Sequence, residues 1–168
     1  MSTYNAAGRS TPELLSDWAA VMRELRKRDV IRTNNNPVGD IAEAIVAAHY
    51  DGTRGAFAQR GWDVQLPPSD EFPDGERVQV KAMRQTPTNK RSSLSPIRDA
   101  DYDSVVIVIF DEDFNVTEGL RITRPVVEEL FKHKAYVNGR VITVTKALRV
   151  DPRIETIELT DAAQRLHA

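Results

Sequence analysis

The sequence predicts an α/β domain built around a mixed β-sheet that is flanked by helices. Segments with a helical spacing of apolar residues lie at both ends of the chain and between the predicted strands. Residues 105–110 form a continuous run of β-branched and other apolar side chains, which is typical of a strand covered on both faces. This run is therefore placed at the centre of the sheet, with helices on its two sides.

Composition limits what the chain can do. Its 168 residues, 40% of them hydrophobic, suffice for one domain over residues 1–168. It contains no cysteine, so disulfides, thiolate zinc sites and cysteine nucleophiles are excluded. The net charge of -2 excludes a uniformly basic nucleic-acid binder, so phosphate contacts would need a local patch. No apolar run is long enough to cross a bilayer, and we expect a cytoplasmic protein without a membrane partner.

A first helix is predicted over residues 12–28. Thr11 can cap it, and Pro12 suits its first position. Apolar residues recur through this segment at helical spacing, and Trp18 among them is expected in the core. The exposed side carries the basic residues Arg23, Arg26, Lys27 and Arg28.

A second helix is predicted from Asn36-Pro37, a cap followed by a first-turn proline, to about residues 51–52. Glu43 is the only charged residue between Ile41 and Ala48 of this apolar helix. A carboxylate in that setting either lies at a narrow solvent edge or faces a site that needs its charge. Both interpretations are open from the sequence.

The remaining elements are assigned from β-branched runs and turn residues. Strands are expected at residues 56–58, 62–66, 77–83, 105–110, 114–122 and 140–145, and helices at 124–133 and from 160 onward. Turn formers between residues 67 and 75 can reverse the chain, which makes the second and third of these strands antiparallel neighbours.

Three polar residues on those neighbouring strands form a candidate site. The side-chain period of a strand is two, so Gln79 and Lys81 share one face and lie about 7 Å apart. Asp63 comes from the adjacent strand. A carboxylate, an amide and an amine in one place suit a metal-dependent phosphodiesterase. The alternative is a cross-strand ion pair between Asp63 and Lys81, with Gln79 as an ordinary edge residue.

A basic segment follows Lys81 and contains no acidic residue up to residue 98. Its charged residues are Lys81, Arg84, Lys90, Arg91 and Arg98. The last four are predicted to bind nucleic acid through its phosphates, since nothing in the segment suggests base-specific contacts. A solvated surface loop, with Arg98 paired to Asp99 or Asp101, is the alternative.

Several of these residues occur in short motifs that follow one another in a fixed order. The motifs are Asn35-Asn36-Pro37-Val38-Gly39-Asp40-Ile41-Ala42-Glu43, Gly61-Trp62-Asp63, Val78-Gln79-Val80-Lys81 and Ser95-Pro96-Ile97-Arg98-Asp99, with Asp103 ahead of the apolar strand. In this order they resemble a group of uncharacterised bacterial proteins with the restriction endonuclease-like, PD-(D/E)XK nuclease fold. The resemblance extends from about Leu14 to Thr160.

The resemblance implies an αβββαβ-type core at about residues 36–150, preceded by the N-terminal helix. It implies catalytic roles for four residues: Glu43, Asp63 and Gln79 around Mg²⁺ or Mn²⁺, and Lys81 near the scissile phosphate. The sequence departs from the common pattern at Trp62, where a proline is usual, and at Gln79, where a second acid is usual. An amide oxygen is still a suitable ligand for magnesium.

The function implied is a divalent-metal-dependent endonuclease that acts on DNA, with RNA not excluded, in restriction, phage defence or mobile-element biology. Cleavage of both strands favours a homodimer, because one such domain has one site. The alternative is a catalytically weakened nuclease fold that serves as a nucleic-acid-binding or protein-interaction module.

Overall fold

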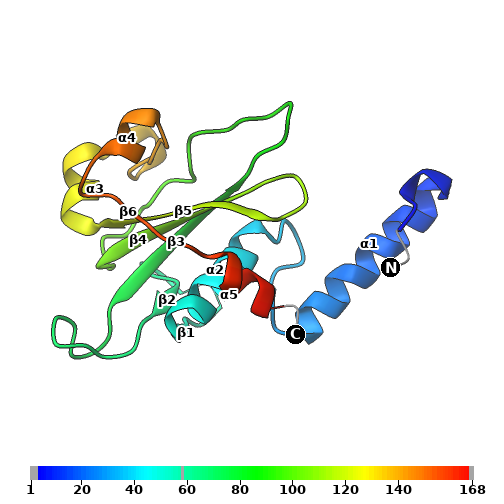
Figure 1. The fold of residues 1–168 in the computed structure, drawn as a ribbon, viewed down its shortest axis with the longest axis horizontal. Coiled ribbons are helices and arrows are strands. Elements are labelled where there is room, and N and C mark those ends of the chain that lie inside the picture. The colour runs from blue at the N-terminus through cyan, green and yellow to red at the C-terminus, as the bar shows by residue number, and fades with distance from the viewer. Residues whose placement is uncertain (1–3, 58, 167–168) are drawn as a thin grey trace.

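The structure is a computed structural model that describes residues 4–57 and 59–166 (Figure 1). It has a mixed α/β architecture with a six-stranded sheet in the order β1-β2-β3-β4-β5-β6. The strands are β1 (Thr53–Arg54), β2 (Val64–Gln65), β3 (Arg77–Arg84), β4 (Ser104–Phe110), β5 (Val116–Thr123) and β6 (Glu155–Thr156). β3 and β4 are parallel, and the other neighbouring pairs are antiparallel. The predicted α/β class is confirmed at this level.

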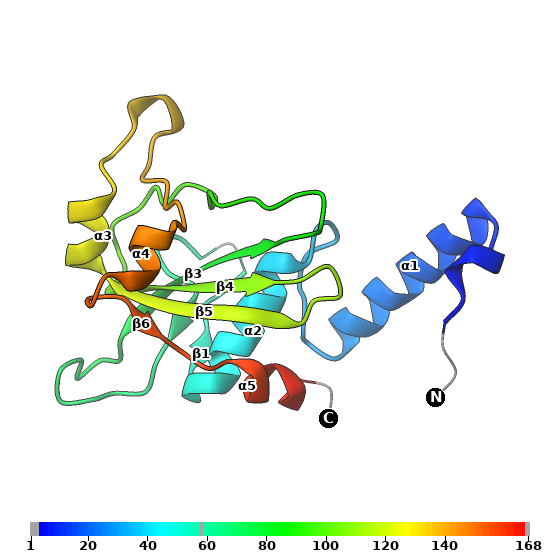
Figure 2. The ribbon, with the colours of Figure 1, turned by 45° about the horizontal axis from the view of Figure 1, so that its top comes forward.

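Helices cover both faces of this sheet (Figure 2). The helices are α1 (Thr11–Lys27), α2 (Val38–Tyr50), α3 (Arg124–Leu130), α4 (Lys146–Val150) and α5 (Thr160–Arg165), with short 3₁₀ turns at Ala6–Gly8 and Ala135–Val137. One hydrophobic cluster lies between the sheet and α2 and α5, and a second includes residues of α3 and α4. Within the described part of the chain, no helix is both long and apolar enough for a bilayer crossing.

Strand β4 lies between the two clusters, as its composition predicts. All seven of its residues are buried. Val106 and Val108 contribute to the cluster beneath α2, while Ile107 and Ile109 contribute to the opposite one. Apolar side chains on both faces are therefore needed along the whole strand.

Helix α1 forms where it is predicted but is not packed as predicted. It begins after Ser10, which forms a capping box with Glu13, and it extends away from the sheet (Figure 1). Met22 is buried, but Trp18 is 49% exposed, so the prediction of a core position for Trp18 is wrong. Helical periodicity identifies an apolar face without identifying a surface that covers it.

Two predicted strands are also corrected. The strand expected at residues 56–58 lies earlier, at β1, and residue 58 is outside the described residues. Residues 140–145 form isolated bridges instead of a sheet strand, Ile97 with Arg140 and Ser93 with Thr143. Ile142 is fully buried, because this segment packs against the β3–β4 connection instead of a sheet edge.

Candidate functional site

The sheet brings Asp63 and Gln79 into direct contact. Asp63 immediately precedes β2, which pairs with β3 in the register Val64 opposite Val78. The Oδ2 atom of Asp63 accepts a hydrogen bond from the backbone N–H of Val80 at 2.7 Å and another from Nε2 of Gln79. The predicted neighbourhood of these two side chains is therefore present, and the Asp63 carboxylate is held in a defined orientation against β3.

Gln79 directs its amide nitrogen, not its oxygen, at Asp63. In this arrangement the amide nitrogen of Gln79 orients the Asp63 carboxylate. The amide oxygen of Gln79 is then not the atom beside Asp63, where a metal ligand would be needed. A half-turn of the amide would exchange the two atoms, so the role of Gln79 as a metal ligand stays a prediction.

Glu43 faces the same region from helix α2. Together with Asp63, it lines a cavity of about 160 Å³, which we call the carboxylate cavity. Its lining residues are Arg32, Asp40, Glu43, Ala56, Phe57, Gln59 and Asp63. The structure places the Glu43 carboxylate at this cavity, where it pairs with Arg32, and its role in a site that needs its charge stays a prediction.

Two of the three carboxylates that line this cavity, those of Glu43 and Asp63, have raised pKa values. Burial, followed by repulsion from Asp63, raises the pKa of Glu43 to about 7, against a weaker opposing effect of its hydrogen bond to Arg32. Burial also raises the pKa of Asp63, although the N–H of Val80 and the charge of Lys81 partly offset it. Two neighbouring buried carboxylates are the kind of oxygen pair that a hard divalent cation stabilises.

Two arginines next to Glu43 are not predicted from the sequence. Arg32 Nη2 lies 2.8 Å from Glu43 Oε2, and Arg54 Nη2 lies 3.8 Å from the same oxygen. Arg32 precedes Glu43 by eleven residues, and a linker and part of a helix separate them. No local periodicity relates such positions, so only the tertiary structure reveals this contact.

Lys81 is held by the loop that follows β3. Its Nζ atom donates hydrogen bonds to Ser95 Oγ and to the carbonyl of Pro96, each at 3.3 Å. Burial lowers the pKa of Lys81, while attraction to Asp63 opposes this effect and the charge of Arg98 adds to it. Among the ion pairs of the described residues, none joins Lys81 to Asp63, so the alternative of a direct cross-strand pair is not observed.

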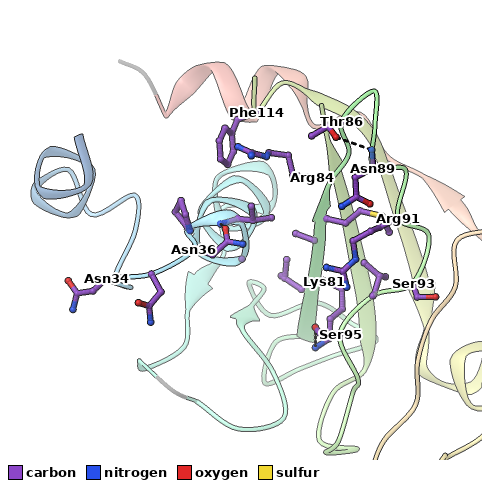
Figure 3. Close-up of a pocket in the computed structure, with 18 of the residues that line it drawn as sticks. Asn34, Asn36, Lys81, Arg84, Thr86, Asn89, Arg91, Ser93, Ser95 and Phe114 are labelled. Carbon is purple, nitrogen blue, oxygen red and sulfur yellow. Dashed lines mark hydrogen bonds between the residues drawn. The ribbon is translucent and has the colours of Figure 1, made fainter. Parts of the chain in front are cut away.

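A second and larger hollow adjoins Lys81 (Figure 3). It has a volume of about 870 Å³ and lies between β3 with its following loop on one side and the α1–α2 linker with the start of α2 on the other. We call it the basic cleft, because its charged lining residues among those described are Lys81, Arg84 and Arg91, with no Asp or Glu. Thr86, Asn89, Ser93 and Ser95 add polar groups to the same wall (Figure 3).

The four residues predicted to bind nucleic acid do not all reach this cleft. Arg84 and Arg91 line it, and Arg84 lies over the ring of Phe114 with 4.7 Å between Cζ and the ring centroid. Lys90 instead lines a separate hollow. That hollow also contains Asp111, Glu112 and Asp113.

Arg98 contributes positive charge near Lys81, since it helps to lower the pKa of that lysine. The expected alternative pairing with Asp101 does not form, because Asp101 is bound by Arg77. Within the described residues no ion pair joins Arg98 to Asp99 either.

Lys81 lines the basic cleft but not the carboxylate cavity. Its charge still interacts with the carboxylates of Asp63 and Glu43. Across residues 4–57 and 59–166, no three acidic or histidine side chains cluster closely enough to enclose a metal ion by themselves. A cation at Glu43 and Asp63 would therefore need additional oxygen ligands, from Gln79, the backbone, water or substrate.

Comparison with protein-family models and with curated proteins finds no match to this chain.

Proposed function

We propose that the protein is a divalent-metal-dependent endonuclease that hydrolyses phosphodiester bonds in DNA. The observation that carries the proposal is that Lys81 lines a cleft whose described charged groups are all cationic, while its charge also interacts with the partly buried carboxylates of Glu43 and Asp63. Phosphodiester hydrolysis needs both features, since the polyanionic strand must be held while charge at one phosphate is neutralised.

The residues of the carboxylate cavity fit a hard divalent cation. Glu43 and Asp63 are both partly buried and line the same cavity, and repulsion from Asp63 contributes to the raised pKa of Glu43. A cation between them would relieve that repulsion. We propose Mg²⁺ or Mn²⁺ held by Glu43 and Asp63, with Gln79 as a third ligand after rotation of its amide. When bound, such an ion supplies charge neutralisation and an activated water.

The residues of the protein would then have separate roles in binding and catalysis. Asp63 is fixed through Oδ2 by the N–H of Val80, and its other oxygen, Oδ1, would bind the cation. Two roles are open to Lys81: in its charged form it stabilises the negative charge of the phosphate, and in the neutral form favoured by burial it accepts a proton from water. Arg84 and Arg91 would hold phosphates on the approach to Lys81.

The biological setting that we propose is restriction, phage defence or mobile-element biology, in the cytoplasm, where a cysteine-free protein is compatible with a reducing environment. A homodimer is the assembly that would cut both strands, because each chain contributes one such site. Sedimentation of the free protein and of its DNA complex would test this stoichiometry.

A second candidate function has specific support. Glu43 is already neutralised by Arg32, and Gln79 stands where an acid would strengthen metal binding. Both features suit a weakened nuclease fold that binds nucleic acid without cutting it.

Incubation of the purified protein with plasmid DNA separates the two functions. A nuclease nicks or linearises the plasmid in Mg²⁺ or Mn²⁺ and stops when the metal is chelated, whereas a binding module only retards it on a gel. Parallel reactions with RNA decide between the two nucleic acids. If neither metal supports cleavage at any concentration, the endonuclease proposal is wrong.

A further inference from the structure

Arg32 is held over Glu43 by contacts on several sides. Its guanidinium donates to the carbonyl of Gly55 at 2.7 Å and to Glu43 Oε2 at 2.8 Å. Its backbone N–H donates to Asp40 Oδ2 at 2.6 Å. The Arg32 side chain is 24% exposed and that of Glu43 is 17% exposed, so both partners are largely shielded from water. This is a positioned contact at the wall of the carboxylate cavity, not a mobile surface pair.

The surrounding charges are balanced before any metal enters. Three carboxylates and three cations interact in this region: Asp40, Glu43 and Asp63, and Arg32, Arg54 and Lys81. Net attraction for a divalent cation is therefore weaker than the three carboxylates of the cavity alone would suggest. Of the two arginines, Arg32 is in direct contact with Glu43, and Arg54 is about 1 Å farther from the same oxygen.

We propose that Arg32 is a built-in counter-cation of Glu43, which a divalent metal ion must displace from the carboxylate before the site fills. The inference rests on the proposed function, since it concerns the same metal site. Displacement leaves the guanidinium with other partners nearby, because Gly55 still accepts its hydrogen bond and the ring of Phe57 lies 5.9 Å from Cζ. Arg32 thereby sets the metal concentration at which the site becomes occupied.

Direct measurement of Mn²⁺ binding tests this role without relying on activity. Free Mn²⁺ is followed by electron paramagnetic resonance during titration of the wild type, Arg32→Gln and Arg32→Lys. Removal of the positive charge in Arg32→Gln should tighten Mn²⁺ binding by roughly tenfold, because repulsion between the guanidinium and the ion is removed. Arg32→Lys keeps the charge and should stay within about threefold of the wild type.

Arg26→Gln is the matched control. Arg26 is tied to the same linker through the carbonyl of Thr33 but does not line the cavity, so its replacement should leave Mn²⁺ affinity unchanged. Equal or weaker Mn²⁺ binding by Arg32→Gln, compared with the wild type, would overturn the inference while leaving the metal-dependent function standing. Failure of the wild type to bind Mn²⁺ would instead overturn both.

A second measurement uses the wild type and does not depend on the folding of a variant. In protein labelled with ¹⁵N at arginine, the Nε–Hε resonance of Arg32 should move on addition of Mg²⁺, because its ion pair with Glu43 is broken. The resonance of Arg149, which pairs with Glu118 elsewhere, should not move. An unchanged Arg32 resonance in protein that has bound Mg²⁺ would show that the ion does not displace it.

Discussion

The carboxylate cavity and the basic cleft differ in how the chain builds them. The cavity is small and takes its charged residues from the α1–α2 linker, α2 and the start of β2. The cleft is several times larger, and its basic wall comes mostly from one continuous segment, β3 and the loop after it. A charged groove can therefore be formed by one short segment of the sequence. A cluster of balanced charges instead requires segments that are distant in the sequence to come together.

The largest expected effect distinguishes one residue of each hollow, Asp63 of the carboxylate cavity and Lys81 of the basic cleft, from the rest of the surface. Asp63→Ala and Lys81→Ala should each reduce plasmid cleavage by at least about a hundredfold, because each removes a group that acts on the transition state. The rate at which supercoiled plasmid disappears, in Mg²⁺ and in Mn²⁺, measures the effect.

The matched controls are Asp113→Ala and Lys132→Ala, which remove the same side-chain types from exposed positions. Both controls should cut at the wild-type rate. Equal residual nicking by the wild type, Asp63→Ala and Lys81→Ala would indicate a contaminating nuclease and would exclude the assigned roles.

The next effect isolates the basic cleft. The double change Arg84→Glu and Arg91→Glu should weaken DNA binding by about a hundredfold. It should also reduce the slope of log affinity against log salt by about 1 for each phosphate that the protein no longer neutralises. Fluorescence anisotropy with unrelated duplexes, in the absence of metal, should show the same weakening for each sequence.

Lys90→Glu tests the cleft more specifically. Lys90 belongs to the basic segment that follows Lys81, but it lines a different hollow. Its effect should be several-fold smaller than that of Arg91→Glu, although both change one lysine or arginine to glutamate. If the two single variants weaken binding equally, the strand does not follow the cleft.

A smaller effect concerns the ionisation of Glu43 in the metal-free protein. The pKa of Glu43 is raised from 4.5 to about 7, so the folded protein holds this proton more tightly than the unfolded chain does. Its contribution to stability is therefore largest below pH 4.5 and is lost as the pH rises to about 7. The loss of stability should be about 3 kcal/mol over that interval.

Denaturant unfolding with chelator present, between about pH 4.5 and pH 8, measures this cost. Glu43→Gln cannot ionise at this position, so its stability should decline less with pH than that of the wild type. Parallel curves for the two proteins would contradict a strained carboxylate at residue 43.

The smallest expected effect tests whether Gln79, at the position where the family pattern usually has a second acid, is a metal ligand. Gln79→Glu replaces the amide that donates to Asp63 with a second carboxylate, so without metal the variant should melt a few degrees lower. With Mg²⁺, stronger attraction between ion and ligands should recover this stability, which makes the metal-induced rise in Tm larger in the variant than in the wild type. An identical metal response in both proteins would remove Gln79 from the ligand set.

Much of the fold could be predicted because it depends on short-range patterns. Apolar spacing identifies α1 and α2, although their N-cap residues are Ser10 and Pro37 and not the predicted Thr11 and Asn36. The apolar run identifies β4 as the central strand. The contact between Asp63 and Gln79 also follows from the sequence, since only one turn separates their strands and the hydrogen-bond register then places them together.

The predictions that needed long-range information were incomplete or wrong. The sequence placed Trp18 in the core, but whether a helix face is covered depends on segments far along the chain. Residues 140–145 have the composition of a strand, yet they bridge to the β3–β4 connection instead of joining the sheet. Lys90 and Arg91 are adjacent in sequence and still line different hollows, because the loop between β3 and β4 exposes them on different sides.

The pattern of residues alone was enough to locate α1, α2, α3 and α5, the central strand and the Asp63–Gln79 neighbourhood, whereas α4 was not predicted. Only the tertiary structure decided that Glu43 faces Asp63, that Arg32 neutralises it, and that Lys81 binds the loop and not Asp63. Electrostatic energies depend on distance and burial in space, and a local pattern specifies neither for charges on separate elements.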